Sequence, residues 1–455
     1  MFPREGFSAS RRLVASFAVL SLLASAGLSA RGAPSGETYR KEPMPPGFHV
    51  EQTELDGPVF ADATGHTIYR WPLKDLRNGD AGERKGQPTC TNEKHTESTG
   101  LQSPYPGGYT LPDLDTRPSC AELWPPVLAP AGAKAVGKWT IVDRPDGQKQ
   151  WAYDGYALYT SVLDQRAGDV LGGTARSVKA DSSAVREPVG PPLALPPQFR
   201  VYVVATGRLL VLNTGYSVYT SDRDGPNKSK CDAVCAQEWS PVLAPAYVQA
   251  EGDLGVITTS PGVHQWTFRK KPLYTHISDS RFHSLEGSDV PGWHNVYTSV
   301  APKPPGFTVQ DTRSGQVLAD THGRTVYVYF CGDDSIDQFA CDHPSSSQAY
   351  RFAISGGGIP ERALKTWPYV VADKNARTTS RSWSIIEINP QTGHKAVAGE
   401  AGDLRVWAFR DRPVFTFSGD SKPGDVEGDG WGEFNGWRDG FKAFWLRDDY
   451  GENAS

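Results

Sequence analysis

Residues 138–160, KWTIVDRPDGQKQWAYDGYALYT, contain the pattern on which the fold prediction rests. Apolar and polar residues alternate on both sides of residues 145–147, Pro-Asp-Gly, which is the composition of a β-hairpin with a tight turn. A second turn at residues 154–155, Asp-Gly, leads into a further short run that ends at Tyr159. This stretch therefore predicts short antiparallel strands joined by tight turns.

The aromatic spacing of this stretch occurs twice more along the chain. Trp151 precedes Tyr159 by eight residues, as Trp266 precedes Tyr274 and Trp407 precedes Phe415. Because regular spacing indicates repeated structural units, we expect an all-β protein of three tandem homologous domains. Each domain is expected to be a small antiparallel sheet with one short helix and one disulfide. The aromatic residues assigned to this scaffold are Tyr69, Tyr159, Tyr219, Tyr274, Tyr327, Phe415, Trp124, Trp239, Trp367, Trp151, Trp266 and Trp407.

Proline-rich segments set the expected domain boundaries, because proline stiffens linkers and cannot donate a hydrogen bond to a strand partner. The spelling Pro-Pro-x-Phe opens each unit, and residues 185–198 and 301–305 are expected to be the joints between units. The predicted domains are residues 44–184, 196–300 and 303–455. Insertions at about 75–118 and 331–365 distinguish the first and third units and are expected to be surface loops.

The first thirty residues have the composition of an export signal. Arg4, Arg11 and Arg12 precede an apolar run at residues 13–28, which is short for a membrane span. We therefore expect residues 1–30 to be a removed signal peptide and the mature chain to be periplasmic or secreted, without a membrane span. The choice between the general and the twin-arginine export routes stays open.

The six cysteines fall two per unit, at Cys90 and Cys120, Cys231 and Cys235, and Cys331 and Cys341. An even number of cysteines in an exported chain predicts disulfides, and pairing within each unit is the simplest arrangement. The alternatives are metal thiolates or a redox pair. Cys-x2-Cys spacing does not occur, so the common zinc and thioredoxin-type patterns do not fit.

Two stretches that contain cysteines have the clearest helical pattern. Residues 119–124 and 231–239 contain no glycine or proline and are followed by proline, which predicts a short helix in each. Cys120 and Cys235 each stand four residues before a Trp and would share a helix face with it.

The chain resembles the secreted-repeat family, also described as predicted lipoproteins, whose motif is Tyr-x-aromatic-x-x-Asp. Residues 415–420, FTFSGD, are the closest copy, and residues 231–241 match the accompanying Cys-x3-Cys-Ala-x-x-Trp-x-Pro pattern. The resemblance implies an exported protein of repeated domains and no established reaction. The lipid-attachment cysteine of many family members does not occur here, so lipid anchoring is not implied. In the motif, the aromatic residues are expected to share a strand face and the Asp to cap the next turn.

Candidate metal ligands are few. Asp425, Glu427 and Asp429 resemble the opening of a calcium loop, but position twelve of that loop is Gly436 instead of Glu. A turn is therefore favoured at this place. The other candidates are His276, His283 and His294, whose spacing matches no known ligand pattern and favours solvated loop histidines.

The formal charge of -5 and the lack of a Lys/Arg cluster argue against a nucleic-acid partner. The sequence contains no recognisable catalytic motif, so we predict no catalytic residue and no cofactor, and an enzyme with dispersed groups in the insertions stays open. The leading hypothesis is an exported non-catalytic module that binds an envelope protein or glycan. The alternative is a periplasmic metal-binding or electron-transfer protein.

Overall fold

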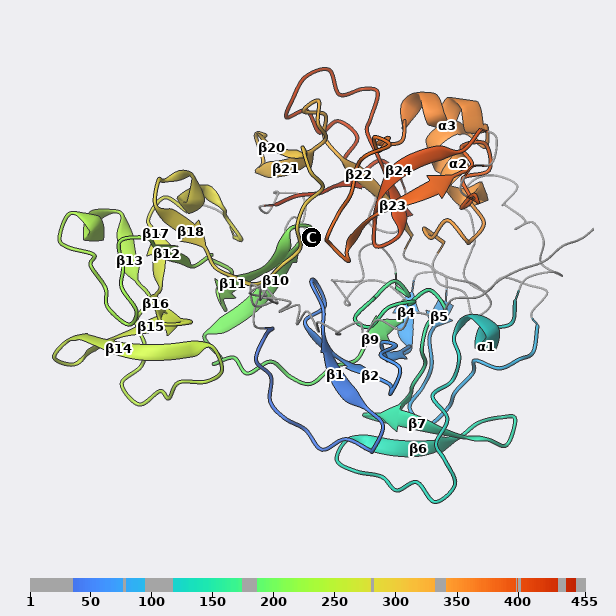
Figure 1. Ribbon diagram of the computed structural model, residues 1–455, viewed down its shortest axis with the longest axis horizontal. Coiled ribbons are helices and arrows are strands. Elements are labelled where there is room, and N and C mark those ends of the chain that lie inside the picture. The colour runs from blue at the N-terminus through green and yellow to red at the C-terminus, as the bar shows by residue number, and fades with distance from the viewer. Residues whose placement is uncertain are drawn as a thin grey trace, which may run out of the picture. The chain divides into compact units, whose positions relative to one another are not determined.

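The computed structural model describes residues 36–76, 79–94, 118–173, 186–279, 282–331, 341–397, 399, 402–432 and 439–446. The predicted signal peptide, residues 1–30, lies outside this described part. Residues 36–455 form one unit by their contacts. Three regions follow one another along it: the N-terminal region (residues 36–188), the middle region (residues 199–300) and the C-terminal region (residues 308–446). Strands and tight turns dominate all three, and helices are few (Figure 1).

Small antiparallel sheets build the N-terminal region. The predicted hairpin around residues 145–147 is present, since β6 pairs with β7 and β7 pairs with β8. Its period-two pattern places Trp139 and Trp151 in the interior. The elements are β1 (His49–Gln52), β2 (Pro58–Ala61), β3 (Tyr69–Arg70), β4 (Lys74–Leu76), β5 (Gly79–Ala81), α1 (Cys120–Leu123), β6 (Trp139–Asp143), β7 (Lys149–Tyr153), β8 (Tyr156–Ala157) and β9 (Glu187–Pro188).

The middle region contains a three-stranded sheet of order β10-β11-β19, another of order β14-β15-β16, and a four-stranded sheet of order β13-β17-β12-β18. Its elements are β10 (Phe199–Val204), β11 (Gly207–Leu212), β12 (Tyr219–Ser221), the 3-10 turn η2 (Cys235–Gln237), β13 (Trp239–Pro241), β14 (Leu254–Ser260), β15 (Val263–Phe268), β16 (Lys271–Pro272), β17 (Tyr274–His276), the 3-10 turn η3 (Glu286–Asp289), β18 (Trp293–Asn295) and β19 (Tyr297–Val300).

The C-terminal region joins five strands in the order β23-β24-β25-β22-β26, beside the hairpin β20-β21. Its elements are β20 (Thr308–Asp311), β21 (Gln316–Ala319), β22 (Tyr327–Cys331), α2 (Ala349–Gly356), α3 (Pro360–Thr366), β23 (Trp383–Ile388), β24 (Leu404–Phe409), β25 (Arg412–Phe415) and β26 (Asp439–Ala443).

One pattern of strand pairing occurs in all three regions. The first motif tyrosine lies between two strands, one carrying the second motif aromatic and one from the end of the region. Tyr219, for example, pairs with Tyr274 on one side and with Asn295 on the other. The corresponding pairs are Tyr69 with Tyr159 and Pro188, and Tyr327 with Phe415 and Ala443. All twelve scaffold aromatics are buried.

The largest apolar cluster contains residues of every region. Leu55 from the N-terminal region and Leu209 from the middle region belong to the same cluster as Phe307 and Trp383. The indole Nε1 of Trp383 donates a hydrogen bond to the carbonyl of Ala205 at 3.1 Å. The three regions therefore share part of their hydrophobic core and are not structurally independent of one another.

Several local expectations differ from the structure. After β2 the chain turns back in a narrow hairpin, in which the Asp62 amide donates to the carbonyl of His66 and the Ile68 amide to the carbonyl of Phe60, while β2 also pairs with the preceding β1. The segment expected as a linker after residue 185 contributes β9, which pairs with β3. The strands β3 and β9 have two residues each and leave little trace in a sequence, which explains this difference.

The expectation of one short helix in each region is also wrong in detail. The middle region has only the 3-10 turn η2 at the expected place, and the C-terminal region has two helices, α2 and α3. Both helices lie within the insertion that was expected to be a surface loop, and Tyr350 and Phe352 of α2 are buried. The insertion at about 75–118 is described only in part, and it includes β4 and β5.

Candidate functional site

The motif tyrosines and aspartates meet inside each region. The hydroxyl of Tyr69 donates a hydrogen bond to Asp164 Oδ2 at 2.8 Å, across 95 residues of sequence. Tyr219 donates to Asp279 at 2.9 Å, and Tyr327 donates to Asp420 at 2.7 Å. The aspartate that ends one motif copy therefore accepts the tyrosine of the other copy. The sequence predicted a turn cap for this aspartate, and the cross-copy contact was missed because it depends on strand order.

A glycine eight residues after each motif aspartate completes the arrangement. The amide of Gly172 approaches the Tyr69 hydroxyl at 3.3 Å, and that of Gly287 approaches the Tyr219 hydroxyl at 3.4 Å. A Cβ on Gly172 would lie 2.5 Å from the Trp124 ring. A residue with any side chain would therefore displace the buried indole.

Burial determines the electrostatics of this Tyr–Asp–Gly–Trp arrangement. Loss of solvent raises the pKa of Asp164 to about 8, and the nearby Asp169 and Asp56 act in the same direction. Burial likewise raises the pKa values of Asp279 and Asp420 to about 6. Asp164 and Asp279 are buried and Asp420 is half-buried, so a surface for a ligand has to be sought elsewhere.

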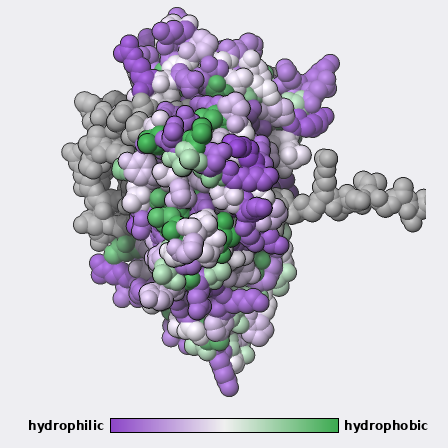
Figure 2. Space-filling model, turned by 90° about the vertical axis from the view of Figure 1, so that its left-hand side faces the viewer, coloured by the Kyte–Doolittle hydropathy of each residue, from purple (hydrophilic) through white to green (hydrophobic). Residues whose placement is uncertain are grey.

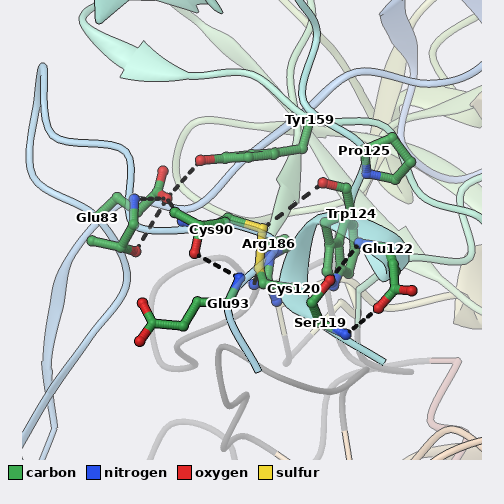
Figure 3. Close-up of a disulfide and its surroundings, with 12 residues drawn as sticks. Glu83, Cys90, Glu93, Ser119, Cys120, Glu122, Trp124, Pro125, Tyr159 and Arg186 are labelled. Atoms are coloured by element: carbon green, nitrogen blue, oxygen red, sulfur yellow. Dashed lines mark hydrogen bonds between the residues drawn. A yellow bond between two sulfur atoms is a disulfide. The ribbon is translucent and has the colours of Figure 1, made fainter. Parts of the chain in front are cut away.

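The disulfides pair the cysteines as they are grouped along the sequence: Cys90 with Cys120, Cys231 with Cys235, and Cys331 with Cys341. The Cys90–Cys120 disulfide is buried among charged and aromatic groups (Figure 3). Glu83 Oε1 accepts the amide of Cys90 at 3.2 Å and the hydroxyl of Tyr159 at 2.6 Å. The buried guanidinium of Arg186 lies 4.0 Å from the centre of the Trp71 ring. Cys90 and Cys120 are at most 1% exposed, so their surroundings shield this disulfide from solvent.

The Cys331–Cys341 disulfide is also buried, and Asp439 lies beside it. These three residues form the one group in the described part of the chain whose ligand atoms lie close enough for a metal ion. Because the two sulfurs are bonded to each other, they are not available as thiolate ligands. The group is therefore not a metal site in this form of the protein.

The Cys231–Cys235 disulfide has different surroundings. Both cysteines are partly exposed, and both line a pocket of about 10 Å³, the space of roughly one water molecule. The other lining residues are Ser221, Arg223, Asp224, Lys230 and Trp293. The Trp293 ring stacks on Trp239 with 3.6 Å between ring centroids. The middle region therefore presents its disulfide in a small pocket with an aromatic wall.

The three candidate histidines of the middle region do not converge on one point. His276 packs against Trp239 at 4.4 Å, His283 stacks on Tyr202 at 3.5 Å, and His294 lies 3.0 Å from Asp222. None of them belongs to a group with metal-ligand spacing among the described residues. Their positions fit aromatic packing and surface pairing better than a metal site.

The acidic loop of the C-terminal region uses its carboxylates within the fold. Asp425 Oδ2 accepts the amides of Ser421 and Lys422. Asp429 accepts the amide of Ala443 at 2.8 Å and the indole Nε1 of Trp445 at 3.1 Å. Glu427 is exposed and lies in a turn of the same loop. The hydrogen bonds favour the structural interpretation of this loop over a calcium site.

An exposed aromatic cluster lies on the middle region, at the turn between β11 and β12. Tyr216 is 37% exposed and Phe282 is 42% exposed, with their rings 5.4 Å apart. The His283 ring lies 6.4 Å from Phe282 and stacks on Tyr202. Figure 2 views the side of the middle region and shows hydrophobic groups interrupting a mostly hydrophilic surface. This cluster could not be predicted from local sequence patterns, because its members come from three separate segments.

The backbone of this aromatic cluster is strained at one residue. His283 has φ of 57°, in the left-handed region that residues with side chains rarely adopt. Its amide donates to the carbonyl of Gly215, and a Cβ on Gly215 would meet the Phe282 ring at 3.0 Å. The turn and the aromatic rings therefore fix one another. Strained residues of this kind concentrate at functional sites.

A buried charged cluster links the C-terminal region to the N-terminal region. Arg412 pairs with Asp342 at 2.9 Å and donates to the carbonyl of Leu171 at 2.7 Å. Arg410 pairs with Asp56 at 2.9 Å. Burial lowers the pKa of His343, which lies at this cluster, to about 4. The Arg410–Asp56 ion pair and the hydrogen bond from Arg412 to Leu171 join the two regions.

The comparisons with known proteins support an exported repeat. Residues 140–174 match the model of a family described as a secreted repeat of unknown function. The matched segment includes β7, the motif aspartate Asp164 and Gly172. No curated protein and no solved structure matches the chain. Among the described helices, none has the length and apolar character needed to cross a membrane.

Proposed function

We propose that this protein is an exported, non-catalytic binding module of three tandem homologous domains, residues 44–184, 196–300 and 303–455, released after removal of residues 1–30. The match of residues 140–174 to a secreted repeat supports export, as do three disulfides, which persist in oxidising compartments. The strand pairing shared by the three regions supports common descent of the domains.

The exposed aromatic cluster is the main observation that supports a binding role. The scaffold aromatics are buried, whereas Tyr216 and Phe282 stay exposed and are held in place by a strained turn. Exposed aromatic rings are common anchors at interfaces, because they bury a large area at a low cost in side-chain entropy. We assign this cluster to contact with an envelope glycan or an envelope protein.

Binding of the purified mature chain to isolated cell-wall glycan and to solubilised envelope protein tests the proposal. The double variant Tyr216→Ala, Phe282→Ala should weaken binding by about 10-fold or more, as is typical when interface anchors are truncated. Tyr247→Ala is the matched control, because Tyr247 is 99% exposed and stands apart from the cluster.

Each outcome is informative. A loss of glycan binding in the double variant identifies a sugar partner, and a loss of protein binding identifies a protein partner. Equal binding by the double variant and by the wild type would remove the aromatic cluster from the binding site. No binding to either fraction would refute the binding role.

A further inference from the structure

The Cys231–Cys235 disulfide closes a much shorter loop than the other two. Its cysteines are 4 residues apart in sequence, whereas the others are 30 and 10 apart. The entropy that a disulfide removes from the unfolded chain grows with loop length, so this bond contributes least to folding. Breaking it would release only the turn around η2 and would leave every strand of the middle region in place.

Access to the sulfurs also differs. Cys90, Cys120, Cys331 and Cys341 are at most 2% exposed, whereas Cys231 and Cys235 are both partly exposed. Thiol–disulfide exchange requires that a thiolate reach one sulfur in line with the bond. Because Cys231 and Cys235 are partly exposed, a thiolate can approach them from the solvent side, next to Trp293, whereas the pocket itself holds no more than about one water molecule.

Two basic residues at the pocket favour the leaving thiolate, while the carboxylate of Asp224, which also lines the pocket, opposes them. Arg223 and Lys230 line the pocket with the two cysteines. Arg223 pairs at 3.7 Å with Asp232, which also accepts the amide of Cys235. Lys230 forms no ion pair within the described residues, while its amide donates to Asp224. The Lys230 ammonium is therefore available to stabilise a thiolate, as cations near reactive cysteines do.

We propose that the Cys231–Cys235 disulfide is a redox site that accepts two electrons from an exported protein carrying a reduced dithiol. A thiolate of the dithiol attacks one sulfur, forms a mixed disulfide and releases the other sulfur as a thiolate. The second thiolate of the partner then attacks the mixed disulfide. The partner leaves as a disulfide, and Cys231 and Cys235 become thiols by taking up two protons.

Graded reduction of the purified oxidised chain tests this site. The chain is equilibrated with increasing dithiothreitol, free thiols are alkylated, and peptides are identified by mass spectrometry. Cys231 and Cys235 should become alkylated at a reductant concentration at least about 10-fold lower than the other four cysteines. The far-ultraviolet circular dichroism should stay unchanged at that point. Joint reduction of all three disulfides, or loss of secondary structure with the first, would overturn the proposal.

A trapping experiment tests the exchange step separately. The variant Cys235→Ser keeps Cys231, which should form a mixed disulfide with a thioredoxin variant that retains only its attacking cysteine, after activation of Cys231 with an aromatic disulfide reagent. In the otherwise unaltered chain, Lys230→Gln should slow reduction of the Cys231–Cys235 bond by reduced thioredoxin about threefold or more. Lys228→Gln is the control, because Lys228 is exposed but does not line the pocket. Failure to trap the mixed disulfide, or equal rates for both lysine variants, would count against the site.

Discussion

The N-terminal and middle regions hold their disulfides at corresponding places but cover them differently. In both, an acidic residue seven positions before the first cysteine accepts an amide hydrogen bond: Glu83 accepts the Cys90 amide, and Asp224 accepts the Lys230 amide. In both, the second cysteine precedes a buried Trp by four residues. Only the N-terminal region adds Arg186, stacked on Trp71 and Trp124 above the bond.

The two regions share their scaffold and differ in the residues that cover the disulfide. The strand pairing and the Tyr–Asp–Gly–Trp arrangement are alike in both regions, and they do not determine whether the disulfide is accessible. The covering residues do. Arg186 and Trp293 stand at corresponding positions, two residues before Pro188 and Asn295, and each packs on the buried Trp of its own region. Differences in chemistry between the regions therefore arise from the residue at this position, while the buried motif stays the same.

Removal of the two disulfides should give the largest difference between these regions. The pair Cys90→Ala, Cys120→Ala opens a long loop and should lower the free energy of unfolding by about 4 kcal/mol, against about 2 kcal/mol for Cys231→Ala, Cys235→Ala. Urea unfolding followed by circular dichroism measures both. Equal losses would show that the short disulfide stabilises the fold as much as the long one, contrary to the comparison.

The glycine beside the buried Trp should respond alike in both regions. Gly172→Ala brings a Cβ to 2.5 Å from Trp124, and Gly287→Ala brings one to 2.5 Å from Tyr219. Each should destabilise the protein by about 1–3 kcal/mol, the usual cost of overpacking a core. Gly225→Ala is the control, because its Cβ would meet only Lys228 at an ordinary 3.8 Å. If only one of the two substitutions destabilised the protein, the Tyr–Asp–Gly–Trp arrangement would not be equivalent in the two regions.

The dependence of stability on pH should also differ between the two regions, and this is the smallest of the three expected effects. The folded pKa values of Asp164, about 8, and Asp279, about 6, lie above the ordinary 3.8. The folded state then binds the proton more tightly, so this contribution is complete below about pH 4 and is lost as pH rises through the folded pKa. Stability should fall as the pH rises from 4 to 8, and Asp164 should account for the fall above pH 6.

Urea midpoints of the wild type, Asp164→Asn and Asp279→Asn measure this contrast. Asp164→Asn should flatten the dependence above pH 6, while Asp279→Asn should flatten only the part below it. An unchanged slope above pH 6 in Asp164→Asn would assign the effect to another group.

The sequence predicts the parts of this fold that depend on local pattern. The hairpin of β6 and β7 follows from alternation around Pro-Asp-Gly, and the cysteines pair as they are grouped along the chain. The contact of Tyr69 with Asp164 was not predicted, because strand order brings the residues together and no local pattern records it. The aromatic cluster was missed for the same reason, since Tyr202, Tyr216 and Phe282 are distant in sequence. His283 was selected for its imidazole, whereas in the structure its ring stacks on Tyr202.

The contacts of Arg410 and Arg412 with the N-terminal region affect the order in which parts of the chain fold. Arg412 donates to the carbonyls of Leu171 and Gly173, which lie 241 and 239 residues earlier. Because a chain is synthesised from its amino end, this loop is made long before its arginine partners. Contacts of such wide separation form late and slow folding. The N-terminal region therefore reaches its final packing only after the hairpin of β24 and β25 has been synthesised, and a chain truncated before it would leave those carbonyls without their arginine donors.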